Sequence, residues 1–140
     1  MTSHHHLRVQ TNLQELSHVL TWFEKLNQSF IPRDVWIKCQ TALAEGFTNA
    51  VKHAHRNLSV ETPIDIDVTI TPQQLEIQIW DYGPAFDLIE KLGSQASAWD
   101  LDASSGRGLK LIQQLVDQFS YRQETGDRNC LVMIKQYSAP

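Results

Sequence analysis

The sequence lacks a long apolar run, an excess of basic charge and a leader-like apolar segment. No apolar stretch approaches the roughly 20 residues that a membrane-spanning helix needs, and the N-terminus has no signal-peptide core. The formal net charge of −4 argues against a general basic surface that would hold nucleic acid. These absences predict a cytoplasmic protein that has neither nucleic acid nor a membrane as a partner.

Two further absences concern cysteine and phosphate-binding motifs. The only cysteines are Cys39 and Cys130, and each lies in an apolar pattern with no CxxC partner. Both are therefore expected to be reduced and buried. The sequence contains no P-loop, and its glycine spacing does not fit a dinucleotide-binding fingerprint. Any phosphate site must use another arrangement.

What is present fits one compact domain. The 140 residues are 41% hydrophobic, which suffices for a single core. Apolar periodicity predicts, in chain order, a strand at 7–10, helices at 12–27 and 34–55, strands at 64–70 and 75–79, a short helix at 88–92, a helix at 108–118, and strands at 119–123 and 130–135. This order predicts an α+β fold, a two-layer α/β sandwich with helices on one face of a mixed, mainly antiparallel sheet. Residues 1–6 are expected to form a tail, and residues 7–140 the single domain.

The first stretch that could carry chemistry lies on the second expected helix. Glu45 and Asn49 are four residues apart and share a helix face, and Lys52 and His53 follow one turn later. A carboxylate can accept a proton from an attacking hydroxyl, and an amide oxygen is a suitable ligand for Mg²⁺. An ammonium group can neutralise phosphate charge. The alternative is the solvated polar face of an ordinary helix.

The second and third stretches are glycine-containing loops. Asp81 ends a strand and is followed by Gly83, so the carboxylate could bind an exocyclic amine while the glycine admits a flat ring. A tight Gly-Pro turn is the alternative. Gly106 and Gly108 open into a helix, whose N-terminal amides and dipole favour a phosphate. A flexible loop with a helix cap would give the same pattern.

The three stretches, in this order, resemble the nucleotide-binding boxes of the Bergerat-fold (GHKL-type) ATPases, the group that contains gyrase, histidine kinases and mismatch-repair ATPases. Glu45 to Asn49 resembles the N box, Asp81 to Gly83 the first glycine box, and Gly106 to Gly108 the second. Within the group, the amino-acid sequences of the three boxes most resemble those of the anti-sigma-factor serine/threonine kinases. The resemblance extends over nearly the whole chain.

The resemblance implies roles for individual residues. Glu45 is expected to be the catalytic base, and Asn49 the Mg²⁺ ligand. The residues expected to bind ATP are Asn49, Lys52, His53, Asp81, Gly83, Ala85, Gly106, Arg107, Gly108 and Leu109. Residues 94–106 are expected to form a lid over the nucleotide. Pro84 and Ala85 replace a second glycine of the first box, which stiffens that loop.

The function implied is ATP-dependent phosphorylation of a small STAS-type anti-anti-sigma protein, as part of transcription regulation. A sigma factor is the second partner that the resemblance suggests, and the family pattern is compatible with a homodimer. The alternative is an ATP-gated module that sequesters a sigma factor or another regulator without significant phosphoryl transfer. Glu45 favours catalysis, because a pure binding module has no need of a base there.

Overall fold

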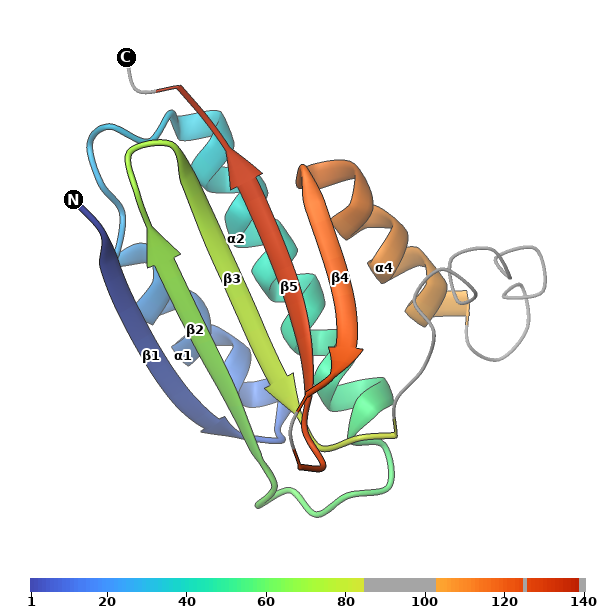
Figure 1. The fold of residues 1–140 in the computed structure, drawn as a ribbon. Coiled ribbons are helices and arrows are strands. Elements are labelled where there is room, and N and C mark those ends of the chain that lie inside the picture. Colours follow the sequence, from blue (N-terminus) through green and yellow to red (C-terminus); the bar gives the residue numbers. More distant parts are fainter. Residues whose placement is uncertain (85–102, 125, 139–140) are drawn as a thin grey trace.

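The computed structural model describes residues 1–84, 103–124 and 126–138. Its five strands form one sheet in the order β1-β2-β3-β5-β4, and all four pairings are antiparallel (Figure 1). The bounds are Ser3–Gln10 for β1, Pro63–Ile70 for β2, Gln74–Asp81 for β3, Gln118–Gln123 for β4 and Asn129–Gln136 for β5. The predicted α+β sandwich is confirmed, although the described strands pair only in antiparallel fashion and the expected mixed sheet was wrong.

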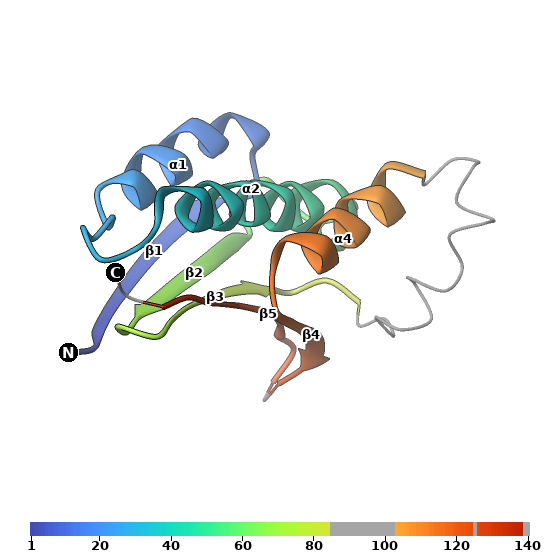
Figure 2. The ribbon, with the colours of Figure 1, turned by 90° about the horizontal axis from the view of Figure 1, so that it is seen from above.

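The described helices all cover one face of this sheet (Figure 2). A 3₁₀ turn, η1 (Leu13–Glu15), leads into α1 (Leu16–Glu24). The central helix α2 (Arg33–Asn49) begins after Pro32 and continues into one π-helical turn, η2 (Ala50–Ala54). The last helix, α4 (Ala103–Leu115), packs beside α2. No helix in the described part of the chain is long and apolar enough to cross a membrane.

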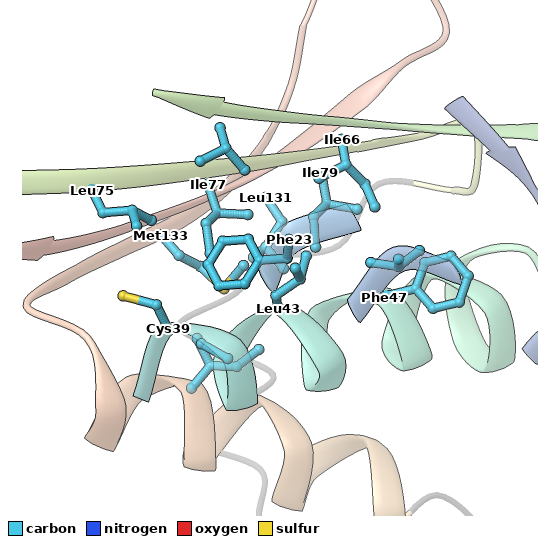
Figure 3. Packing of buried hydrophobic residues seen from close by; sticks show 14 of the residues in the cluster. Phe23, Cys39, Leu43, Phe47, Ile66, Leu75, Ile77, Ile79, Leu131 and Met133 are labelled. Carbon is cyan, nitrogen blue, oxygen red and sulfur yellow. The ribbon is translucent and has the colours of Figure 1, made fainter. Parts of the chain in front are cut away.

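The core lies between the helices and the inward face of the sheet (Figure 3). Alternation along β2 and β3 turns their isoleucines inward, where they are fully buried. Phe23 and Trp36 stack with ring centroids 4.3 Å apart and join α1 to α2. Cys39 and Cys130 are free and buried as predicted, and burial raises the pKa of each thiol to about 12. This packed core fixes the position of α2 on the sheet.

Strand β1 begins earlier than expected. The sequence predicted a tail at residues 1–6, but the sheet includes the chain from Ser3 onward. The histidines pair across the strands, because His4 Nδ1 lies 3.0 Å from the hydroxyl of Thr69 and His6 Nδ1 lies 2.7 Å from a carboxylate oxygen of Asp67. These cross-strand contacts extend β1 toward the N-terminus. The sequence prediction used only the short apolar run at 7–10 and therefore missed this extension.

Candidate functional site

A pocket between α2 and α4 gathers most of the first predicted stretch. Its volume is about 250 Å³. The lining residues are Glu45, Thr48, Asn49, Lys52, His53 and Gly108. Five of the predicted site residues thus meet here, including one from a distant part of the chain. A carboxylate, an amide, an ammonium and an imidazole share one concave surface, which suits a charged ligand better than an apolar one.

Two glycines bring the neighbouring elements close to Glu45. A Cβ on Gly46 would lie 2.7 Å from Cδ1 of Ile79, so this glycine lets α2 sit tightly on β3. A Cβ on Gly108 would lie 3.1 Å from Oε2 of Glu45. The carboxylate of Glu45 therefore faces the backbone of α4 directly across the pocket, with no side chain between them.

Asn49 lies one turn beyond Glu45 and is buried. Its side-chain oxygen Oδ1 has no hydrogen-bond partner among the described residues. A buried amide oxygen without a partner is costly, because the group loses its bond to water and gains nothing in return. The atom is therefore a ready ligand position for a hard cation or a donor group.

The start of α4 differs from the prediction. The sequence predicted that Gly106 and Gly108 open into a helix beginning at residue 108, whereas α4 begins at Ala103. An α-helix leaves only its first four N–H groups unpaired. The amide of Gly108, at the sixth position, lies beyond that group, so it cannot cradle a phosphate while the first turn stays helical. Helical periodicity placed the start too late, because two glycines and two serines weaken the helical signal.

Other predicted residues in this part of the chain have different outcomes. Leu109 is fully buried in the hydrophobic core, so its side chain does not reach the pocket. Gly106 and Arg107 are both part of α4. The structure describes the backbone of Arg107 but not its side chain. Ala85, the short helix at 88–92 and the lid up to residue 102 also lie outside them.

Asp81 forms the centre of a buried hydrogen-bond cluster at the end of β3. Its Oδ1 accepts hydrogen bonds from the backbone N–H of Gly83 at 2.9 Å and from Nδ2 of Asn129 at 3.0 Å. The hydroxyl of Tyr121 lies 3.1 Å from Oδ1 and 3.0 Å from Oδ2. Three donors from three separate segments thus hold one carboxylate in place.

Gly83 serves a packing role that the sequence interpretation did not anticipate. A Cβ at this position would lie 2.2 Å from the carbonyl oxygen of Ala54, at the end of η2. The missing side chain therefore lets the loop after β3 rest on η2, rather than only admitting a flat ring. The carbonyl of Gly83 also accepts a hydrogen bond from Nδ2 of Asn129 at 2.6 Å.

His55 ties the same loop to the segments that follow β1 and precede β2, at the same end of the sheet. The backbone N–H of Tyr82 donates to His55 Nε2 at 2.8 Å, so this nitrogen carries no proton. The proton is then on Nδ1, which lies 2.7 Å from the hydroxyl of Thr11, and that hydroxyl donates to the carbonyl of Thr62 at 2.7 Å. A neutral imidazole of one tautomer completes this chain of bonds.

This arrangement predicts a loss of stability in acid. Burial lowers the pKa of His55 below its ordinary value, and the nearby charge of Asp81 opposes this only in part. Below about pH 6.5 the unfolded chain takes up a proton on His55 that the folded chain does not. The free energy of unfolding should therefore fall as the pH drops, by at most about 1.4 kcal/mol per pH unit for this one group.

The measurement is the melting temperature between pH 7.5 and pH 5, for the wild type and for His55→Gln. The variant keeps every other titrating group, so its curve should be flatter than that of the wild type. Parallel curves would contradict a neutral, buried His55.

The sequence interpretation missed Tyr121, Asn129 and His55. One signal was available for Asn129, since it occupies an inward position of β5 where the following inward residues, Leu131 and Met133, are apolar. No local pattern identifies Tyr121, because its contact with Asp81 depends on the strand order β3-β5-β4.

Comparison with known proteins agrees with this geometry. The model of the family described as histidine kinase-like ATPase domain matches residues 9–135. Serine-protein kinase RsbW of Staphylococcus aureus strain bovine RF122 / ET3-1 is 34% identical over 91 residues, which is 61% of this chain and 57% of that protein. The proteins of the same name from strains MRSA252 and JH9 show the same identity and coverage. The match thus spans little more than half the length of these relatives.

Proposed function

Because this chain belongs to the histidine kinase-like ATPase domain family, we propose that it binds ATP with Mg²⁺ beside α2 and phosphorylates a serine or threonine of a protein partner. The observation that carries the proposal is the pocket in which Glu45, the unpartnered oxygen of Asn49 and Gly108 converge. The relatives named serine-protein kinase support the choice of acceptor group. The resemblance of the three boxes supports a STAS-type anti-anti-sigma protein as substrate and a sigma factor as second partner.

The residues of the pocket fit Mg²⁺ held together with a nucleotide. Among the described residues, no cluster of three or more histidine, cysteine, aspartate or glutamate side chains could hold a metal by itself. Mg²⁺ commonly binds through one or two protein oxygens together with substrate phosphates and waters. Oδ1 of Asn49 would supply the protein ligand, and the ion would neutralise phosphate charge when bound.

Glu45 and Lys52 have separate roles in the transfer step. The carboxylate of Glu45 accepts the proton of the incoming hydroxyl as the new oxygen–phosphorus bond forms. The bond from the γ-phosphorus to the β,γ-bridging oxygen breaks at the same time, and ADP leaves. Lys52 is exposed at the edge of the pocket, where its ammonium can offset the charge on the phosphates.

Access of phosphate to the amide of Gly108 requires the first turn of α4 to open. Glycine costs about 1 kcal/mol relative to alanine at each helix position, so Gly106 in the first turn and Gly108 just after it make the start of α4 easy to unwind. Opening would free N–H groups at a new helix N-terminus beside Glu45, where an anion is favoured. The glycines thus support nucleotide binding because they allow the first turn of α4 to unwind.

The test is incubation of the protein with labelled Mg-ATP and a panel of STAS-domain proteins. We expect label on a serine or threonine of one panel member, with loss of transfer in Asn49→Ala. Tight binding of Mg-ATP without transfer to any member would replace the kinase proposal with the ATP-gated binding module.

Asn49→Ala gives a separate prediction for binding. We expect the affinity for ATP to fall about tenfold in the presence of Mg²⁺, because a ligand to the ion is lost. In EDTA the wild type and the variant should bind ATP equally, and Asn49→Asp, which keeps an oxygen at the same place, should restore part of the Mg²⁺ effect. Titration calorimetry with and without Mg²⁺ measures this. An equal loss under both conditions would remove Asn49 from the metal site.

A further inference from the structure

We propose that Tyr121 and Asn129 are positioning residues that hold Asp81 as a pure hydrogen-bond acceptor and thereby select a purine carrying an exocyclic amine. This inference rests on the proposed function, since it assumes that the base of ATP lies at Asp81. It goes further by assigning the choice of base to two residues on β4 and β5.

The contacts around Asp81 are unevenly divided between its two oxygens. Oδ1 has three donors within reach, from Gly83, Tyr121 and Asn129. Oδ2 has only the hydroxyl of Tyr121 among the described residues. A carboxylate oxygen can accept about two hydrogen bonds. Among the contacts of the described residues, Oδ2 is therefore the oxygen that retains the capacity to accept another hydrogen bond.

Tyr121 and Asn129 both act as donors to Asp81. Burial, together with the charge of Asp81, raises the pKa of Tyr121, so its hydroxyl keeps its proton at neutral pH. Asn129 is buried, and its Nδ2 bridges Oδ1 of Asp81 and the carbonyl of Gly83. Asp81 thus serves as the acceptor in each of these hydrogen bonds.

An acceptor in this position distinguishes purines by chemistry. Adenine carries an amine at C6, which can donate to Oδ2, whereas guanine carries an oxygen there, and two acceptors would face each other. Rejection of a group that leaves a buried polar atom unpaired can be strong. If Tyr121 or Asn129 is lost, the carboxylate is free to turn, and the discrimination should weaken.

The experiment compares ATP with purine riboside triphosphate, which lacks the amine, by calorimetry on the whole chain. For Tyr121→Phe we expect about a tenfold loss of affinity for ATP and less than a twofold loss for the analogue. Tyr137→Phe is the matched control, because its hydroxyl donates to backbone carbonyls of Thr71 and Gln74, at the opposite end of β3. It should change neither affinity. Asn129→Ser provides a second variant should Tyr121→Phe fail to fold.

Each result has a defined meaning. A selective loss for ATP supports the positioning role, because a purely structural defect would weaken both nucleotides alike. Equal losses for both nucleotides, or unchanged affinity for ATP, would overturn it. A wild-type protein that binds neither nucleotide would overturn the proposed function itself, and this inference with it.

Discussion

Glu45→Gln is expected to bind Mg-ATP almost as well as the wild type but to transfer phosphate 10²- to 10⁴-fold more slowly, which is the usual range for the loss of a general base. The substitution keeps the shape of the side chain and replaces only the carboxylate that faces Gly108 across the pocket. An amide cannot accept the hydroxyl proton, while the ligands of the nucleotide remain. Single-turnover transfer to the partner and nucleotide binding by calorimetry separate the two effects.

Glu61→Gln is the control for this prediction. Glu61 is an exposed glutamate in the loop before β2, so its substitution removes the same charge without touching the pocket. It should transfer phosphate at the wild-type rate. Undiminished transfer by Glu45→Gln would exclude Glu45 as the base, and a parallel loss of nucleotide binding would show that the carboxylate acts in binding instead.

Gly83→Ala should destabilise the protein by about 3 kcal/mol, near the upper end for overpacking. The new Cβ would lie 2.2 Å from the carbonyl oxygen of Ala54 and 2.7 Å from its carbon, and backbone atoms cannot swing aside as a side chain can. Either the loop or η2 must move, which strains the bonds of Gly83 to Asp81 and Asn129. We expect the melting temperature to fall by about 10 °C and ATP affinity to fall with it.

Gly108→Ala is the matched control for stability. Both changes reduce the conformational entropy of the unfolded chain by a similar amount, so this effect cancels in the comparison. The Cβ at position 108 would approach only the far end of the flexible Glu45 side chain, at 3.1 Å. Its melting temperature should stay within a few degrees of the wild type. If the two variants melt together, the contact of Gly83 with Ala54 is not tight.

Local pattern was enough to predict most of the fold. The alternation in β2 and β3 survives in the structure, because each strand has one face on an apolar core and the register cannot slip without exposing it. Helix α2 was predicted for the same reason, with Pro32 marking its start. The strand at residues 3–6 was missed because its stability comes from polar partners on β2, which lie far away in the sequence.

The candidate site was predictable only where it is local. Glu45, Asn49, Lys52 and His53 follow one another on a helix, so their spacing was sufficient to place them on one pocket. The proximity of Gly108 to Glu45 required the packing of α4 on α2, which no single segment encodes. The donors around Asp81 depend on long-range strand pairing, and helical periodicity alone could not show where α4 begins.

The π-helical turn η2 acts as a phase shift in the longest helical segment of the described chain. The N–H of His55 donates to the carbonyl of Ala50 at 2.8 Å, five residues back rather than four. One extra residue in a turn rotates everything after it by about 100°. Glu45 and Asn49 therefore keep one phase and line the pocket, while Ala54 and His55 take another and meet the loop after β3. The π turn thus lets a single helical segment serve two sites that lie on different sides of it.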